Sequence, residues 1–392
     1  MRLGDVIEIK HGYAFSGENI IEDDNNVVLV TPGNFKKGGG FQEKKCKFFD
    51  GEIPHDYVLK EGDFIVTMTD LSKTIDTLGY SALIPHSDKR MYLHNQRIGL
   101  VLFKNEICDR GYIYWLMRTH RYQREIANTS TGSTVHHTSP TKIRDYEFEA
   151  PSLEAQNRIA TILSRYDSLI ESYQKQIKLL EEAAQRLYKE WFVDLRFPGH
   201  ENTKIVDGVP EGWEKKRLID LVDVQYGYAF DGKLFNNTGE GMPILRIRNI
   251  PDGITSDYTT EEASPNYIVH DGDIVVGMDG FFHINSWNGG DAYLVQRACS
   301  FRPKTESTRG FIFQAIQEPI KYFEQTLVGA TVAHLGKKHI DFIELIVPAN
   351  KDLYIPFQKG FMQRQSFLSQ IRLLTEARDR LLPKLMSGEI AV

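Results

Sequence analysis

Residue types that could carry catalysis occur in this sequence, but not at the spacings that catalysis needs. An amino-methyltransferase holds its target amine with an Asn/Asp-Pro-Pro-aromatic motif, and the sequence contains no Pro-Pro pair. Residues 336–338 (Gly-Lys-Lys) lack the upstream glycine and the hydroxyl of a phosphate-binding loop. Residues 251–252 (Pro-Asp) lack the following Glu-x-Lys of a nuclease metal site, and residues 136–137 (His-His) lack carboxylates at ligand spacing. The sequence therefore favours a non-catalytic chain that holds no metal and no cofactor of its own.

The composition is that of a soluble protein of two or three domains. The chain has 392 residues, of which 41% are hydrophobic and 26% charged, and its net charge is −6. It shows no apolar run long enough for a membrane span and no signal peptide, and its three cysteines have no zinc or disulfide spacing. We expect a reduced, cytoplasmic protein, whose contacts with any nucleic acid come from local basic patches or from partner subunits.

The sequence contains an internal repeat. Residues 3–17 and 218–232 share seven of fifteen positions at an offset of 215, including the motif Gly-Tyr-Ala-Phe. Further matches follow in the same order, among them Gln96-Arg97 with Gln296-Arg297. Chance does not keep so many matches in order, so the chain is a duplicated domain. Because Gly-Tyr-Ala-Phe is common to both halves, we interpret it as scaffold.

Each half shows short runs of β-type residues separated by Gly-rich turns, with one amphipathic helix. The expected strands are 27–30, 64–68 and 98–103 in the first half and 244–247, 274–276 and 342–347 in the second. The expected helices are 112–126 and 311–325. Each half is predicted to be a mixed α/β domain with a largely antiparallel sheet.

Residues 153–192 show two apolar rows at heptad spacing, without a polar residue in ten positions. That pattern is the a/d seam of a helix lying along a partner helix, and about 40 residues give a helix of roughly 60 Å. A weaker copy of the seam follows the second half, where Gly360, Arg364 and Arg378 interrupt it. The residues expected at the helix–helix seam are Ile159, Leu163, Tyr166, Ile170, Tyr173, Ile177, Leu180, Leu187, Phe357, Phe367, Ile371, Leu374 and Leu381.

The predicted order is therefore domain, helix, domain, helix. The boundaries are a first domain at 1–150, a first long helix at 151–197, a linker at 198–217, a second domain at 218–350 and a second long helix at 351–392. Two like helices pack most simply as an antiparallel intramolecular coiled coil with a pseudo-twofold axis. We then expect the domains at opposite ends of the helix pair, a geometry that suits reading two marks at a fixed separation.

Three stretches carry a resemblance to a known family. They are 209–214 (Val-Pro-Glu-Gly-Trp-Glu), 150–163 (Ala-Pro-Ser-Leu-Glu-Ala-Gln-Asn-Arg-Ile-Ala-Thr-Ile-Leu) and 190–199 (Glu-Trp-Phe-Val-Asp-Leu-Arg-Phe-Pro-Gly). Together with the duplicated layout, they resemble the specificity (S) subunit of type I restriction–modification systems. The sequence departs from the family pattern before the first domain, where Pro-Glu-Gly-Trp is missing, and at 353–359, where the start of the second helix is degenerate.

The resemblance implies that each half is a target-recognition domain for one part of a split site in double-stranded DNA. It implies that the long helices dock two methyltransferase subunits and, through them, restriction subunits. S-adenosylmethionine, ATP and Mg would then belong to the partners. The alternative is a duplicated coiled-coil adaptor without DNA specificity, which the acidic net charge favours.

If the chain binds DNA, phosphate contacts come from Lys and Arg, and base contacts from Arg, Asn and Gln. The basic loop at 36–47, the polar loops at 128–139 and 331–339 and the aromatic loop at 281–287 are candidates, with solvated, scaffold or core roles as alternatives. Arg246, Arg248 and Asn249 are expected to share one strand face. The candidate DNA-binding residues are Lys36, Lys37, Lys44, Lys45, Arg97, His137, Lys142, Arg246, Arg248, Asn249, His283, Asn285, Arg297, His334, Lys337 and Lys338.

Overall fold

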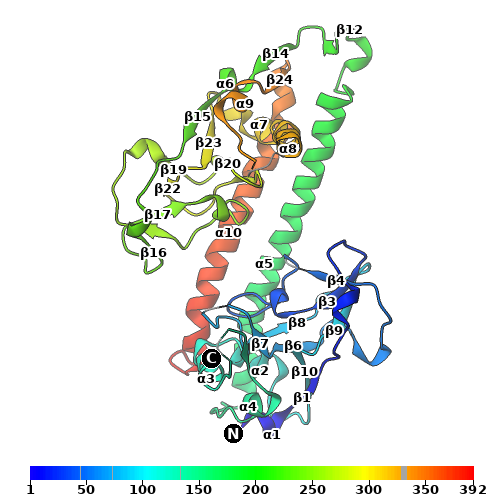
Figure 1. The fold of residues 1–392 in the computed structure, drawn as a ribbon, viewed down its shortest axis with the longest axis vertical. Coiled ribbons are helices and arrows are strands. Elements are labelled where there is room, and N and C mark those ends of the chain that lie inside the picture. Colours follow the sequence, from blue (N-terminus) through cyan, green and yellow to red (C-terminus); the bar gives the residue numbers. More distant parts are fainter. Residues whose placement is uncertain (45, 73, 133, 328–332) are drawn as a thin grey trace. The chain divides into compact units, whose positions relative to one another are not determined.

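The computed structural model describes residues 1–44, 46–72, 74–132, 134–327 and 333–392, and the chain divides into two compact units. Unit 1 comprises Met1–Leu169 and Leu374–Val392, and unit 2 comprises Ile170–Leu373. Each unit contains one mixed α/β domain together with part of each of two long helices, α5 (Leu153–Tyr188) and α10 (Ile355–Met386) (Figure 1). None of the helices within the described residues is both long and apolar enough to cross a membrane.

The domain of unit 1 contains a four-stranded sheet of order β1-β10-β6-β8 and a five-stranded sheet of order β2-β4-β3-β9-β5. The pairing is antiparallel except between β3 and β9. A two-stranded ladder, β7-β11, completes it. The elements are α1 (Leu3–Val6), β1 (Ile7–His11), β2 (Ile20–Ile21), β3 (Val27–Val30), β4 (Lys47–Phe49), β5 (Val58–Leu59), β6 (Phe64–Thr67), β7 (Thr69–Asp70), β8 (Ser81–Leu83), β9 (Met91–His94), β10 (Ile98–Phe103), α2 (Arg110–Leu116), α3 (His120–Asn128), β11 (His136–His137) and α4 (Pro140–Arg144).

The domain of unit 2 repeats this topology. Its four-stranded sheet has the order β15-β23-β20-β21 and its five-stranded sheet the order β16-β18-β17-β22-β19, again with one parallel pair, β17 with β22. The elements are β12 (Ile205–Val206), β13 (Val209–Pro210), β14 (Glu214–Arg217), α6 (Leu218–Leu221), β15 (Val222–Tyr226), β16 (Phe235–Asn236), β17 (Met242–Leu245), β18 (Tyr258–Thr259), β19 (Ile268–Val269), β20 (Ile274–Gly277), β21 (Ile284–Ser286), β22 (Ala292–Leu294), β23 (Ala298–Pro303), α7 (Arg309–Ala315), α8 (Gln317–Thr326), α9 (Lys337–Asp341) and β24 (Glu344–Val347). The predicted duplication of a largely antiparallel α/β domain is confirmed.

One inner strand of each four-stranded sheet, β6 in unit 1 and β20 in unit 2, is buried on both faces. Successive side chains of a strand point to opposite sides, so each of these strands contributes to two cores. In β6, Phe64 and Val66 pack into the core that the helices cover, whereas Ile65 packs into the core shared with the five-stranded sheet. In β20, Ile274 and Val276 face the helical side in the same way, and the intervening valine faces the other sheet. A continuous apolar run, rather than an alternating one, is what such a doubly covered strand requires.

The helical segments after β10 and β23 differ from the prediction. A single helix was expected at 112–126 and another at 311–325, but each is divided into two, α2 with α3 and α7 with α8. In unit 1 the second helix has its own N-cap, because the Thr119 hydroxyl accepts a hydrogen bond from the Tyr122 N–H at 3.3 Å. Capping satisfies a backbone donor that a continuous helix would have bonded internally.

The long helices lie against each other within each unit, and their apolar residues form the contact. In unit 1, Ile159 and Leu163 of α5 share a core with Leu382 and Leu385 of α10. In unit 2, the rings of Tyr173 and Phe367 are 5.1 Å apart, and Ile170, Ile177 and Phe357 are buried. The other predicted seam residues are half-buried, namely Tyr166, Leu180, Leu187, Ile371, Leu374 and Leu381. Buried Phe361, Leu382 and Leu385 belong to the packed face of α10 as well.

The arginines that interrupt the seam of α10 bind carboxylates on α5. In unit 1, Asp167 accepts hydrogen bonds from Arg378 and, at 2.6 Å, from Arg118 of the domain. Burial acts to raise the pKa of Asp167, but the two guanidiniums outweigh it and hold that pKa below its usual value. Arg118 lies over the Trp115 ring at 4.3 Å and also donates to the carbonyl of Gly38 at 2.9 Å. One buried network therefore ties the first domain to both helices.

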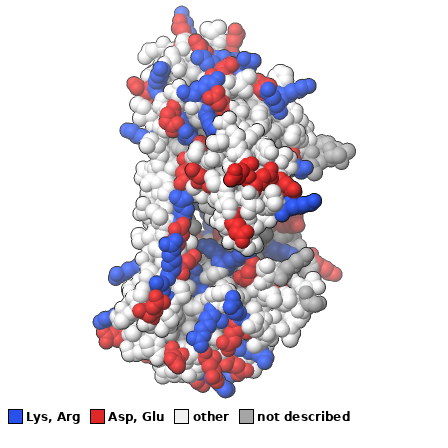
Figure 2. All heavy atoms as spheres, turned by 90° about the vertical axis from the view of Figure 1, so that its left-hand side faces the viewer, with Lys and Arg blue, Asp and Glu red and all other residues white. Residues whose placement is uncertain are grey.

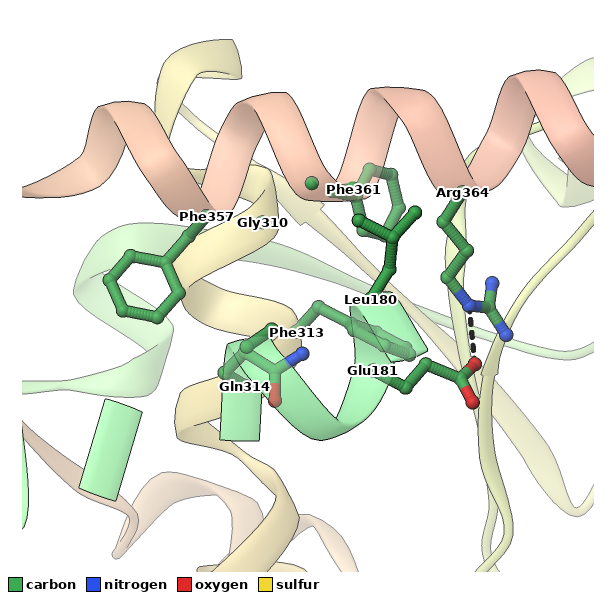
Figure 3. Close-up of a pocket in the computed structure, with 10 residues that line it drawn as sticks. Leu180, Glu181, Gly310, Phe313, Gln314, Phe357, Phe361 and Arg364 are labelled. Atoms are coloured by element: carbon green, nitrogen blue, oxygen red, sulfur yellow. Dashed lines mark hydrogen bonds and ion pairs between the residues drawn. The ribbon is translucent and has the colours of Figure 1, made fainter. Parts of the chain in front are cut away.

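Arg364 makes the corresponding connection in unit 2 (Figure 3). Its Nε donates to Glu181 of α5 at 2.6 Å. Its terminal nitrogens donate to Ser286 and, at 2.9 Å, to Asn285 of the domain. The Arg364 side chain is 10% exposed and the Glu181 side chain 38%. Polar residues in a helix seam specify register, because any other alignment leaves them without partners.

Candidate nucleic-acid interface

The Gln-Arg pairs of the two repeats occupy the same backbone position. In each domain they form the turn at which the chain passes from the five-stranded to the four-stranded sheet. Gln96 N–H donates to the Tyr13 carbonyl at 2.9 Å, and Gln296 N–H donates to the Tyr228 carbonyl at 2.8 Å. The Arg97 carbonyl accepts a hydrogen bond from the Met68 N–H at 2.9 Å, and the Arg297 carbonyl accepts one from the Met278 N–H at 2.8 Å. The two turns thus share these backbone hydrogen bonds, although Arg297 has a φ of +71° and Arg97 has no positive φ.

The Gly-Tyr-Ala-Phe motif supports this turn from beneath. A Cβ on Gly12 would lie 2.1 Å from the carbonyl oxygen of Asn95, and a Cβ on Gly227 would lie 2.1 Å from that of Val295. Only glycine permits such a close approach of two backbones. The tyrosine and phenylalanine rings of each motif pack edge to face, at 5.1 Å in the first half and 4.8 Å in the second. These contacts agree with the scaffold interpretation of the motif.

The side chains around the turn differ between the halves. In unit 2, the Asp279 carboxylate forms an ion pair with Nε of Arg297 at 3.2 Å and lies 2.5 Å from Nδ1 of His334. In unit 1 the corresponding position is Thr69, whose hydroxyl lies 3.1 Å from Nδ1 of His137. Arg97 and His137 are exposed, and the Arg297 and His334 side chains are 68% and 60% exposed. Arg297 and His334 are therefore brought together through Asp279 in unit 2, whereas in unit 1 His137 is paired with Thr69.

The basic loop of unit 1 is anchored at its glycines. Gly38, Gly39 and Gly40 all have positive φ, and a Cβ on Gly39 would lie 2.6 Å from the Arg118 side chain. Lys36, Lys37 and Lys44 are exposed, and Lys37 forms an ion pair with Asp76. Lys45 lies outside the described residues, as do residue 133 of the first polar loop and residues 331–332 of the second. The loop presents positive charge next to the turn formed around Asp70 and Asp76.

Asp70 organises that neighbouring turn. Its carboxylate accepts hydrogen bonds from the backbone N–H groups of Ser72, Thr77 and Leu78 and from the Thr77 hydroxyl, at 2.6–3.1 Å. Burial alone would raise the pKa of Asp70, but these donors outweigh burial and lower it. The role of Asp70 is structural, since it positions Asp76 opposite Lys37.

The prediction that Arg246, Arg248 and Asn249 share a strand face is wrong. Strand β17 ends at Leu245, and a 3-10 turn spans Ile247–Asn249. The Asn249 side-chain oxygen caps this turn by accepting from the Arg246 N–H at 2.9 Å, just as the Asn34 oxygen accepts from the Thr31 N–H at 2.8 Å in the first repeat. Arg248 points to Asp257, with an ion-pair distance of 2.6 Å. Asn249 is therefore part of the scaffold, whereas the Arg246 guanidinium lies over the Phe235 ring.

The aromatic loop of unit 2 divides between core and surface. Phe282 and Trp287 are 3% and 0% exposed, whereas Phe281 is 70% exposed and stacks on His283 at 5.9 Å. The Asn285 amide donates to the carbonyls of residues 250 and 251 at 2.9 and 3.1 Å and accepts from Arg364. Asn285 is thus engaged within the fold, and its assignment to base contact stays a prediction. His283 remains an exposed candidate.

Two short helices carry the remaining basic candidates. Lys142 lies on α4, whose N-cap is Ser139, and Lys337 and Lys338 begin α9 at the matching place in unit 2. All three lysines are exposed. On the face drawn in Figure 2, basic and acidic side chains are interspersed rather than segregated. Phosphate contacts on this protein would therefore be local.

Among the described residues, no three His, Cys, Asp or Glu side chains are grouped so that they could hold a metal ion. The buried thiol of Cys299 has a raised pKa owing to burial, which opposes nucleophilic reactivity.

The comparisons with known proteins agree on one family. A family model described as the type I restriction modification DNA specificity domain matches residues 1–182 and 210–378. The MjaIX specificity subunit of Methanocaldococcus jannaschii is 27% identical over 335 residues, covering 80% of this chain and 76% of the relative. The HindI specificity subunit of Haemophilus influenzae is 25% identical, covering 69% of this chain and 75% of the relative. The crystal structure of a type I S subunit from M. genitalium aligns with a TM-score of 0.56 at 16% identity, covering 98% and 95% of the two chains, and so shares the fold.

Proposed function

The chain belongs to the type I restriction–modification DNA specificity family, and on that premise we propose that it reads a split DNA target, one half-site with each repeat. Specificity subunits of type I systems are non-catalytic and act in a complex with DNA and other subunits. In the proposal, two methyltransferase subunits dock on this chain, and restriction subunits join through them. S-adenosylmethionine, ATP and Mg are then bound by those partners.

The observation that carries the proposal is a constant frame with variable side chains. The Gln-Arg turns of the two domains share the backbone hydrogen bonds from glutamine to tyrosine and from methionine to arginine, but Thr69 in the first domain corresponds to Asp279 in the second. Two readers of different half-sites need this combination, because the frame sets where DNA lies and the side chains set which bases are accepted. A single symmetric ligand would give no reason for the divergence.

The long helices support the docking of partner subunits. Leu179 of α5 and Met362 and Leu373 of α10 are 64%, 62% and 55% exposed, although they lie on well-formed helices. Exposed apolar side chains on a helix face are typical of surfaces that another protein covers. The proposal assigns these faces to the methyltransferase subunits.

Single-molecule sequencing of the host genome, with this gene present and deleted, tests the proposed function. We expect one split methylated motif to disappear on deletion and to return when the gene is restored on a plasmid. A methylation pattern that is unchanged by deletion would contradict the proposal.

A gel-shift experiment separates the proposal from the adaptor alternative. The chain together with its methyltransferase subunits should shift a duplex that carries the mapped motif and should not shift a duplex with a scrambled motif. An adaptor would assemble with the subunits but leave their DNA binding unchanged.

A further inference from the structure

A cleft in the second domain joins residues that the sequence places far apart. It has a volume of about 340 Å³ and is lined by Phe230, Gly232, Phe235, Arg246, Ile247, Val295, Gln296 and Arg297. Its lining residues belong to the Gln-Arg turn between β22 and β23, to the segment after β17, and to β16 and the segment that leads into it. Its volume is in the range of sites that receive a small planar ligand, roughly 300–1,000 Å³.

The chemistry of the lining suits a nucleotide. Two arginines and a glutamine supply donors, the buried Phe230 and the partly buried Phe235 form apolar walls, and none of the described residues that line the cleft is acidic. The Arg246 guanidinium lies 5.2 Å from the centre of the Phe235 ring, which holds it in one orientation before any ligand arrives. Arginine pairs with the N7 and O6 atoms of guanine, and glutamine pairs with the N7 and N6 atoms of adenine.

Arg297 is positioned by the fold rather than by chance rotation. Its φ is +71°, a left-handed conformation that is uncommon for a residue with a side chain, and the surrounding hydrogen bonds maintain it. Its Nε lies 3.2 Å from Asp279, which aims the guanidinium while the side chain stays 68% exposed. A strained arginine that is held in place at a cleft is suited to contact a ligand.

We propose that this cleft faces the groove of the second half-site, with Arg246 reading the edge of a guanine, Gln296 reading the edge of an adenine and Arg297 contacting the adjacent backbone phosphate. The inference rests on the proposed function, since it identifies which residues of the second reader choose the base. In the first domain the matching positions keep Gln96 and Arg97 but replace Arg246 with Thr31. The two domains therefore share the anchor and differ in the reading residue.

The test uses the chain assembled with its methyltransferase subunits and fluorescent duplexes that carry the mapped motif. Arg246→Ala and Gln296→Ala should each weaken binding of the cognate duplex by about tenfold or more. Each should also abolish the preference at one base pair of one half-site and leave the other half-site unchanged. Arg217→Ala is the control, because Arg217 is an exposed arginine that pairs with Asp220 at 3.1 Å and does not line the cleft. Thermal unfolding of each variant shows whether it is folded.

Two results would overturn the inference. Folded variants at positions 246 and 296 could bind with the same affinity and the same sequence preference as the wild type. Alternatively, they could lose affinity equally for cognate and scrambled duplexes, which would mean phosphate contact without base reading. A wild-type complex that binds no split motif would instead contradict the proposed function itself, so the two failures are distinguishable.

Discussion

The ion pair between the buried Arg364 and the partly exposed Glu181 provides a quantitative test of how α5, α10 and the second domain are held together. At an effective dielectric constant near 20, two unit charges about 4 Å apart attract by roughly 4 kcal/mol. Glu181 is 38% exposed, so water screens part of this attraction. We therefore expect a coupling free energy of about 2 kcal/mol between the two side chains.

A double-mutant cycle with Arg364→Met and Glu181→Ala measures this coupling. Arg364→Met should lower the free energy of unfolding by about 3–4 kcal/mol, because Asn285 and Ser286 lose their charged donor as well. Glu181→Ala should lower it by about 3 kcal/mol, because the guanidinium stays buried without its counter-ion. The double variant should be less destabilised than the sum of the two.

The exposed pair of Arg186 and Glu182 on the same helix is the matched control. Its atoms are 3.5 Å apart, and the side chains are 81% and 42% exposed, so its coupling should be below about 0.5 kcal/mol. Urea unfolding of the full chain, followed by circular dichroism at pH 7, supplies all the values. If both pairs couple equally weakly, the assignment of Arg364 as a buried connection between helices and domain is refuted.

Three further predictions concern the scaffold. Gly227→Ala should destabilise the chain by about 2 kcal/mol or more in thermal unfolding, since the added Cβ would meet the Val295 carbonyl. Gly360→Ala should stabilise it by about 0.5–1 kcal/mol, because the added Cβ meets open space on α10. Equal effects of the two substitutions would contradict the close packing at Gly227. Asp167 has a lowered pKa in the folded state, so its contribution to the free energy of unfolding is complete above the pKa of the unfolded chain and is lost as the pH falls through the folded pKa. The difference in stability between the wild type and Asp167→Asn should therefore be constant from about pH 7 to 5 and shrink below about pH 4. Removing one heptad in register from both α5 and α10 shortens each helix by about 10 Å. The spacer between the two halves of the methylated motif should then shorten by roughly 3 base pairs at 3.4 Å per pair. An unchanged spacer would show that the helices only recruit partners.

Much of the fold could be predicted from the sequence, because the two repeats give the same pattern of elements twice. Strands 27–30 and 98–103 were predicted with the bounds that the structure has, since their apolar runs are short and end at turn residues. The two helical segments were not predicted to divide, because the apolar periodicity continues across Thr119 although a hydroxyl cap starts a new helix there. The predicted strand 244–247 was placed too late by about two residues, and that shift produced the error at Arg248 and Asn249.

The candidate site was less accessible, because it depends on contacts between distant residues. Exposed lysines and arginines are visible in a sequence, but the cleft brings Arg246 and Gln296 together across fifty residues, and no periodicity signals that. The arginines of α10 carried a usable signal. Arg364 and Arg378 stand in an otherwise apolar seam, where a buried charge needs a partner, and a search for carboxylates on the facing helix would have found Glu181 and Asp167.

The most direct test of the central claim, that each repeat reads its own half-site, is a domain exchange. Residues 1–150 are replaced by the equivalent domain of a relative with a different motif, and genome methylation is mapped by single-molecule sequencing. We predict that one half of the methylated motif changes to that of the relative while the other half stays as it is. A change in both halves, or in neither, would contradict independent reading by the two domains.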